Sequence, residues 1–251
     1  MPTKNKAPRA LGFLAVFVLV APPTFAAEGH FERANNDVSN VASLQRGARN
    51  FVNYCYGCHS AKYVRYSKLA QGLGLSETQL MQNLMFTGER PADTMQNAIS
   101  PDDAKRWFGR QPPDLTLIAR SRGPDYVYSF LKSFYLDPTR PTGVNNTVLP
   151  GAAMPHVLWE LQGLQKAVYE GETDAQKNMV KKFKGFELAT KGELSPEESD
   201  QFVRDTVNFL DYIGEPMQLE RQSLGYYVLG YLLVFLLFAY LLKREYWKRV
   251  K

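Results

Sequence analysis

Two segments of the chain have the spacing of apolar residues that is typical of amphipathic helices. In residues 41–54 the apolar side chains recur every three or four positions, and Asn40 precedes them as a helix-capping residue. Residues 196–213 show the same periodicity after a Ser-Pro-Glu-Glu start at 195–198, and the Gly-Glu-Pro segment at 214–216 ends it. We expect these two helices to pack against each other.

The region between these helices carries weaker signals of regular structure. Ser76 and Gln79 have the spacing of a capping box and predict a short helix, and residues 124–135 predict another with a proline at its start. Residues 137–155 contain four prolines and no helical period, so we expect them to form a long loop. The pattern therefore predicts a mainly α domain with long loops.

Both ends of the chain differ from this domain. Residues 1–26 combine three basic residues, an apolar run and a cleavage point after Ala26, which is the pattern of a signal peptide. Residues 224–242 contain no charge, and as a helix they would span about 28 Å, enough to cross a membrane. Tyrosines and a tryptophan flank this span, and residues 243–251 form a basic tail. Because positive charge stays on the cytoplasmic side, residues 27–223 are predicted to be a periplasmic domain with a C-terminal transmembrane helix and a cytoplasmic tail.

The charge of the chain is concentrated in these two end segments. The formal net charge is +5, but residues 1–26 carry +3 and residues 243–251 carry +4, which leaves the central domain at −2. Nucleic-acid binding needs a basic surface that faces the phosphates. A slightly acidic domain therefore gives no support for a nucleic-acid partner.

The only two cysteines of the chain stand in one motif. Cys55, Cys58 and His59 form Cys-x-x-Cys-His, the attachment sequence of c-type haem, in which the thiols bind the vinyl groups and the histidine ligates iron. A zinc site needs four ligands and there is no second cysteine pair, while a thioredoxin-like dithiol does not require the histidine. The motif therefore predicts one covalently bound haem c with His59 as an axial ligand.

Other side chains are candidates for contacting the haem. Met154 ends the long loop in Leu-Pro-Gly-Ala-Ala-Met-Pro, where prolines and small residues allow the backbone to approach a flat ligand closely. His156 is its rival as the second axial ligand, and His30 is a more distant alternative. Arg120 and Arg122 are candidates for pairing with the haem propionates. Position in the sequence alone leaves the choice of second ligand open.

These motifs together resemble one family, cytochrome c1, the membrane-anchored haem subunit of the cytochrome bc1 complex, in its bacterial form. The haem motif is shared by all c-type cytochromes, whereas the Pro-Pro-Asp-Leu and Asp-Tyr-Val segments ahead of a C-terminal anchor are far more specific. The resemblance covers most of the chain beyond the signal peptide. The segments that carry it are RG at 46–47, NYCYGCHS at 53–60, YVRY at 63–66, PPDLTLIARSR at 112–122, DYVY at 125–128 and EP at 215–216.

The resemblance implies a cytochrome c-like haem domain in which His59 and Met154 are the axial pair. It also implies that Arg122 and Tyr126 approach a haem propionate, with Arg120 as a neighbour. The chain departs from the family where Pro-His-Val follows Met154 in place of the frequent Ala-Pro-Pro, and where the segment after Arg122 is shorter. Some relatives brace the methionine loop with an extra cysteine pair, which this chain lacks.

The implied function is that of a non-catalytic redox subunit of a quinol–cytochrome c reductase. It would pass one electron at a time from the Rieske iron–sulfur protein to a soluble periplasmic c-type cytochrome. The implied partners are cytochrome b, the Rieske protein and this carrier, in a dimeric complex of the bacterial inner membrane. The candidates for docking a basic carrier are Glu193, Glu197, Glu198 and Asp200.

Two other functions have the same haem motif. A membrane-tethered monohaem cytochrome c that feeds another reductase or oxidase would not co-purify with a b-type cytochrome and a Rieske protein. A haem enzyme or gas sensor would leave one face of the iron open and would bind carbon monoxide when reduced. A single attachment motif argues against the two-haem bacterial peroxidases.

Overall fold

The computed structural model describes residues 31–173 and 179–248. The predicted signal peptide, His30 and the last three residues of the basic tail lie outside these ranges. The helices are α1 (Val41–Tyr54), α2 (Tyr66–Leu73), α3 (Glu77–Asn83), α4 (Pro101–Phe108), α5 (Ile118–Arg122), α6 (Pro124–Lys132), α7 (Trp159–Gln162), α8 (Pro196–Gly214) and α9 (Gln218–Trp247). The strands are β1 (Ala61–Arg65), β2 (Thr94–Met95), β3 (Phe134–Leu136), β4 (Val144–Asn146), β5 (Gly163–Thr173) and β6 (Met179–Lys191).

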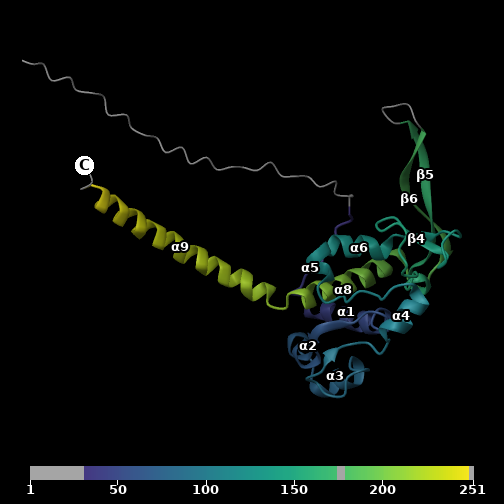
Figure 1. The fold of residues 1–251 in the computed structure, drawn as a ribbon, viewed down its shortest axis with the longest axis horizontal. Helices are drawn as coiled ribbons and strands as arrows, with labels where there is room; N and C mark the ends of the chain where they lie inside the picture. Colours follow the sequence, from purple (N-terminus) through teal and green to yellow (C-terminus); the bar gives the residue numbers. More distant parts are fainter. Residues whose placement is uncertain (1–30, 174–178, 249–251) are drawn as a thin grey trace, which may run out of the picture. The chain divides into compact units, whose positions relative to one another are not determined.

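Helices α1 and α8 lie side by side at the centre of the haem domain, as the sequence predicts (Figure 1). The Asn40 side chain caps α1 by accepting a bond from the Ser43 amide at 3.1 Å, and a complete capping box opens α8. The two helices meet at Gly47, where an added Cβ would lie 2.0 Å from the carbonyl oxygen of Asp205. One turn further along, the rings of Phe51 and Phe209 lie 5.5 Å apart. The glycine therefore permits a close backbone approach that sets the position of the end of α1.

A buried carboxylate fixes the register of α1 against α8. Asp205 accepts hydrogen bonds from Ser43 Oγ at 2.6 Å, from Arg46 Nε at 2.6 Å and from Gln201 Nε2 at 2.9 Å. Asn208 adds a bond from its amide nitrogen to Ser43 Oγ at 2.9 Å. Because buried polar groups are costly unless they are paired, this network tolerates only one relative position of the two helices.

Ion pairs join α6 to the start of α8. Asp200 accepts from Lys132 Nζ at 2.8 Å and from Arg204 Nη2 at 2.5 Å, and Lys132 also bonds Glu32 at 2.6 Å. The Tyr128 hydroxyl donates to the same carboxylate, and its ring lies 4.6 Å from the Lys132 ammonium. Hydrogen bonds from Lys132, Tyr128 and Arg204 outweigh the opposing effect of burial and lower the pKa of Asp200 to about 2.

Each of the three described sheets is an antiparallel pair of strands. β1 pairs with β2, β3 with β4, and β5 with β6. The short sheet of β3 and β4 corrects two sequence predictions. The helix predicted for 124–135 ends at Lys132 and gives way to a strand of aromatic and apolar residues, and the predicted loop at 137–155 contains the partner strand β4.

The hairpin of β5 and β6 was not predicted from the sequence. Its register runs from Gly163 opposite Lys191 to Thr173 opposite Met179, with irregularities at Leu164/Gln165 and Val168/Tyr169 (Figure 1). Each irregularity interrupts the alternation of faces along the strand. The three strand pairs are additions to a domain built mainly from helices, so the predicted mainly α class holds.

Helix α9 is long and apolar enough to cross a membrane, which no other described helix is. It has 30 residues, its most apolar window has a mean hydropathy of 2.0, and none of its side chains is buried. It contains the predicted span 224–242 and continues beyond it at both ends. Glu215, at the C-cap of α8, pairs with Arg120 of α5 and with Arg221 in the first turn of α9. This shared carboxylate links the haem domain to the start of the apolar helix.

Candidate haem-binding site

The cysteine motif forms a tight turn at the end of α1. The amides of Cys55 and Tyr56 both donate to the Phe51 carbonyl at 2.9 Å, and the amide of His59 donates to the Cys55 carbonyl at 2.8 Å. Cys55 is buried and Cys58 is half-buried, and neither forms a disulfide. Burial raises the pKa of the Cys55 thiol to about 12, so the free thiol is protonated at neutral pH. The end of α1 thus presents two thiols and an imidazole within five residues.

His59 has one nitrogen that is already committed. Its Nδ1 lies 2.8 Å from the carbonyl oxygen of Pro113, and because a carbonyl only accepts, Nδ1 carries the proton. The lone pair therefore sits on Nε2. Burial of the ring lowers the pKa of His59 despite opposing effects of the Pro113 bond and the Asp114 charge, so the imidazole is neutral at pH 7. A neutral imidazole with Nε2 unprotonated is the form that ligates a metal.

The segment that supplies this carbonyl is fastened to the chain just after His59. The Leu115 amide donates to the Ser60 carbonyl at 2.9 Å, and Asp114 Oδ2 accepts from the Lys62 amide at 2.8 Å. Asp114 Oδ1 accepts from the Thr116 amide at 3.0 Å. Asp114 belongs to the Pro-Pro-Asp-Leu motif, but the sequence alone predicts no role for it. In the structure, its hydrogen bonds hold the Pro-Pro-Asp segment in the position in which the Pro113 carbonyl orients His59.

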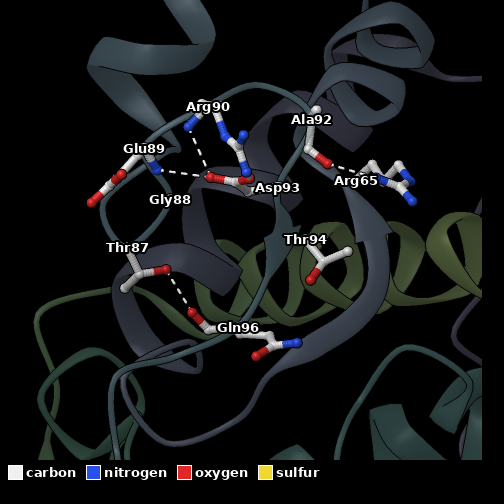
Figure 2. Close-up of a pocket in the computed structure, with 9 residues that line it drawn as sticks. All are labelled: Arg65, Thr87, Gly88, Glu89, Arg90, Ala92, Asp93, Thr94 and Gln96. Atoms are coloured by element: carbon white, nitrogen blue, oxygen red, sulfur yellow. Dashed lines mark hydrogen bonds and ion pairs between the residues drawn. The ribbon is translucent and has the colours of Figure 1, made fainter.

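The tyrosine between the two cysteines is anchored by a separate network. The Tyr56 hydroxyl lies 2.8 Å from the Tyr66 hydroxyl, 2.7 Å from Thr87 Oγ1 and 2.8 Å from the Gln96 carbonyl oxygen. Figure 2 shows the bond from Thr87 to the Gln96 carbonyl on one side of a pocket of about 560 Å³, and Asp93 accepting bonds on the other. Sequence reasoning missed this network, because its members are isolated polar residues without a recognisable spacing.

Met154 lies in the loop that follows β4. Its side chain is half-buried and packs against the hydrophobic cluster that also contains Cys55 and Tyr56. Two asparagines hold the start of the loop. Asn146 Oδ1 accepts from the amides of residues 148 and 149 at 2.9 and 3.0 Å, and Asn145 Oδ1 accepts from the Gly151 amide at 2.8 Å. Sequence reasoning did not single out either asparagine.

His156, the rival ligand, is buried on the same loop. Its ring is stacked on Phe134, and its Nε2 lies 3.3 Å from the Gly163 carbonyl oxygen. Burial lowers the pKa of His156 to about 4, so it is neutral at pH 7. The structure thus places both predicted candidates in one loop, with the methionine half-buried against the hydrophobic core and the histidine stacked on Phe134 of β3.

The expected propionate partners lie on α5 and α6. The Arg122 guanidinium lies 5.6 Å from the centre of the Tyr126 ring, so these two predicted residues are brought together. Tyr126 stacks on Phe130 with ring centres 6.4 Å apart. Arg120, the third candidate, is exposed and directs its guanidinium to Glu215.

The residues present fit a covalently bound haem. Two free thiols flank an anchored turn, Nε2 of His59 has no hydrogen-bond partner among the described residues, and the half-buried thioether of Met154 packs against the hydrophobic core. Soft sulfur and neutral imidazole are the donors that haem iron takes from proteins. The fit uses all four residues that the sequence proposes for attachment and ligation.

The profile of the Cytochrome C1 family matches residues 30–250, which is most of the chain. This chain belongs to the cytochrome c1 family. It is 53% identical over 240 residues to cytochrome c1 of Allochromatium vinosum, covering 94% of this chain and 98% of that protein. It is 39% identical over 245 residues to the ammonia monooxygenase gamma subunit of Nitrosomonas europaea, with 96% and 99% covered. It is 30% identical over 237 residues to cytochrome c1 of Rhodospirillum rubrum, with 83% and 82% covered.

Membership of the cytochrome c1 family confirms the family, fold class and cofactor predicted from the sequence. Cytochrome c1 proteins carry one covalently bound haem c and are the electron-transfer subunit of the cytochrome bc1 complex, in which cytochrome b is a partner. With its apolar C-terminal helix, this cytochrome c1 is a membrane-anchored protein.

Proposed function

We propose that this cytochrome c1 passes single electrons from the Rieske iron–sulfur protein to a soluble periplasmic c-type cytochrome. The observation that carries the proposal is the orientation of His59, whose Nδ1 is held by the Pro113 carbonyl while Nε2 is left for iron. The family membership supports the setting in a bc1 complex, which we propose to be dimeric.

The roles proposed for the site residues follow from their positions. Cys55 and Cys58 would form the two thioethers to a haem, and His59 and Met154 would be the ligands of its iron. Bound haem supplies a one-electron couple between ferric and ferrous iron. His59 is buried and hydrogen-bonded and Met154 packs against the hydrophobic core, so little rearrangement accompanies a change of charge. No acid or base is needed, which agrees with a redox subunit that performs no bond chemistry of its own.

Arginine side chains on α5 are proposed to face the propionate end of the haem. Arg122 is proposed to pair with a propionate together with the Tyr126 hydroxyl, because the two side chains lie against each other. Arg120 contributes positive charge on the same short helix, while its hydrogen bond goes to Glu215. An arginine and a phenol hydroxyl are both suitable donors to a carboxylate.

The proposed topology assigns residues 1–26 to a signal peptide and residues 27–223 to the periplasm. Residues 224–242 cross the inner membrane, and residues 243–251 lie in the cytoplasm. The basic residues that follow the apolar span support this orientation, because positive charge is retained on the cytoplasmic side. The accessibility of the C-terminal tail to protease in sealed membrane vesicles of known orientation tests this topology.

Docking of the soluble carrier is proposed to use exposed carboxylates before and at the start of α8. Glu193 and Glu197 are exposed. Glu198 bonds the Ser195 amide in the capping box, and Asp200 is held by Lys132 and Arg204, so their charges are partly engaged within the protein. Glu193 and Glu197 are therefore the better candidates for weak, salt-sensitive contacts with a basic partner.

Purification in mild detergent tests the assignment to a bc1 complex. We expect this chain to co-elute with a b-type cytochrome and an iron–sulfur signal, and reduced Rieske protein to reduce its haem. A chain that elutes alone with a normal c-type spectrum would support the membrane-tethered cytochrome that serves another reductase or oxidase.

Replacement of Met154 by alanine tests the ligand assignment. We expect the reduced variant to bind carbon monoxide, which the native protein does not, and the potential of the haem to fall, because a thioether ligand raises it. His156→Ala is the matched variant on the same loop, and its iron should remain six-coordinate at ambient temperature. An unchanged spectrum and potential in Met154→Ala would show that another side chain is the ligand.

A further inference from the structure

The loop that carries Met154 ends at a buried histidine with an unusual set of contacts. His156 is 5% exposed, and its ring lies parallel to that of Phe134, with centres 5.3 Å apart and an angle of 7° between the planes. Its Nε2 lies 3.3 Å from the Gly163 carbonyl oxygen. Because a carbonyl only accepts, Nε2 is the donor and Nδ1 is unprotonated in the neutral ring.

The other nitrogen of this ring has no partner among the described residues. His156 Nδ1 is buried and makes no hydrogen bond within the described chain. Buried polar atoms in native proteins are usually paired, so an unpaired one calls for a reason. A phenylalanine would fill the same space without a buried unpaired nitrogen, but it could not donate to Gly163. The donated bond is therefore the property that distinguishes histidine at this position.

The contacts of His156 tie the loop to two strands. Phe134 is the first residue of β3 and Gly163 is the first residue of β5, so one ring holds the loop against both. Only Pro155 separates His156 from Met154. Proline fixes its own φ and restricts the residue before it to extended conformations. A displacement of His156 is therefore transmitted to Met154 with little slack.

We propose that His156 is a positioning residue that holds Met154 as the second axial ligand. This inference rests on the proposed function, in which the Met154 thioether ligates iron. Asn145 and Asn146 hold the start of the loop through hydrogen bonds to its amides, and His156 holds its end through the bond to Gly163. With both ends fixed, the thioether is kept near its bound position, and the loop seldom opens.

A ligand role for His156 itself is the competing interpretation. Such ligation would use Nδ1, whose lone pair has no partner within the described chain, because Nε2 is engaged by the Gly163 carbonyl oxygen. The two interpretations differ in whether the ferric native protein has a sulfur–iron absorption, because iron with two histidine ligands has none. The positioning role predicts its loss in Met154→Ala and its weakening in His156→Ala.

The experiment compares local opening of the loop with global unfolding in the full-length haem-loaded protein in detergent. The sulfur–iron charge-transfer absorption reports Met154, and far-ultraviolet circular dichroism reports the fold, during one thermal scan. We expect His156→Ala to lose the absorption well below its unfolding temperature, and its reduced form to bind carbon monoxide, which the reduced native protein does not. The loop of His156→Phe should open at a temperature between those of His156→Ala and the native protein, because stacking on Phe134 is kept and the bond to Gly163 is lost.

A matched core variant separates positioning from general destabilisation. Leu80→Val removes one methylene from a fully buried residue of α3, which belongs neither to the loop nor to its anchoring strands. It should lower both transitions together. The proposal is overturned if His156→Ala behaves in the same way, or if both of its transitions are unchanged and it binds no carbon monoxide. Should His156→Ala fail to fold, His156→Phe decides by the same criterion.

Two outcomes distinguish failure of the inference from failure of the proposed function. If Met154→Ala keeps the absorption, the ligand assignment is wrong and the positioning role falls with it. If Met154→Ala loses the absorption while His156→Ala matches the native protein, the ligand stands and only the positioning role is wrong. Loss of six-coordination in His156→Ala with none in Met154→Ala would make His156 the ligand.

Discussion

At the scale of single residues, the orientation of the His59 imidazole depends on a main-chain group. The carbonyl oxygen of Pro113 accepts a hydrogen bond from His59, and Asp114 holds this segment in place through two backbone amides. Proline fixes φ but leaves ψ free, so the direction of the Pro113 carbonyl depends on how the residues around it are held. The carboxylate of Asp114 is therefore a structural determinant of the orientation of His59.

Replacing Asp114 by alanine tests this dependence. Loss of two hydrogen bonds to a charged acceptor should lower the free energy of unfolding by about 2–4 kcal/mol and broaden the haem absorption, because His59 becomes less well oriented. Denaturant unfolding and absorption spectroscopy measure the two effects. Lys62→Ala is the control, since Lys62 donates through its backbone amide and its side chain is exposed. Equal effects of the two substitutions would contradict the role of the carboxylate.

The role of a residue can be predicted from the sequence when the residues that act together lie close together in the chain. Cys55, Cys58 and His59 are recognised because attachment requires them at a fixed spacing. Tyr56 acts through a partner far away in the chain, the Gln96 carbonyl, and Asn146 combines its local bonds with one to the distant Phe130 carbonyl. Nothing in the local sequence distinguishes them from ordinary polar or aromatic residues, so only the fold reveals what they hold.

At the scale of elements, the helices with strong caps and a clear apolar face formed where the sequence predicts them. This holds for α1, α3 and α8, where local signals and packing agree. The hairpin of β5 and β6 was missed because its two irregularities move apolar residues from one face to the other, which hides the period of two. The predicted helix at 124–135 overran because β4 offers backbone partners to Phe134 and Tyr135, a tertiary effect.

The close approach of α1 and α8 gives a prediction at this scale. Gly47→Ala should lower the free energy of unfolding by about 1–3 kcal/mol, because the new Cβ would lie 2.0 Å from the Asp205 carbonyl oxygen and the helices must separate. Gly57→Ala is the matched control, since nothing lies within 4 Å of its added Cβ. Chemical denaturation of both variants measures the difference. Equal stability of the two would mean that the contact at Gly47 is not tight.

The ion pairs between α6 and α8 predict a pH dependence. The pKa of Asp200 is lowered to about 2, below its ordinary value of 3.8, so the stabilisation is complete above about pH 4 and is lost as the pH falls toward 2. Asp200→Asn should be less stable at neutral pH and should lose less stability on acidification in this window. Unfolding by urea at a series of pH values measures both. The exposed Glu187→Gln serves as control and should follow the native curve.

At the scale of the whole molecule, the core and the apolar helix are separate parts of the chain. The buried cluster draws on residues between Ala34 and Ile213, whereas α9 contributes no buried residue. Folding of the haem domain therefore does not depend on packing against α9 within this chain. The link between them is the carboxylate of Glu215, shared by Arg120 and Arg221.

Truncation after residue 223 tests this division. We expect a haem-loaded protein that is released from the membrane and keeps the native absorption spectrum, because every described contact of the site lies before that residue. Fractionation of membranes followed by spectroscopy of the soluble fraction gives the answer. A truncated chain that stays with the membrane, or that loses its normal spectrum, would show that the haem domain needs the C-terminal helix.

The hydrogen bonds that hold the Pro113–Asp114 segment against residues 60–63 use mainly main-chain groups of these residues. The exposed side chains of residues 62 and 63 can therefore be exchanged without loss of these bonds. Lys62 and Tyr63 both point to solvent, while their amides donate hydrogen bonds. A change of charge or bulk at these two positions would alter the face offered to a visiting protein without rotating the imidazole. Substitutions at Lys62 and Tyr63 can therefore change the surface beside the cysteine motif while the hydrogen bond that orients His59 is kept.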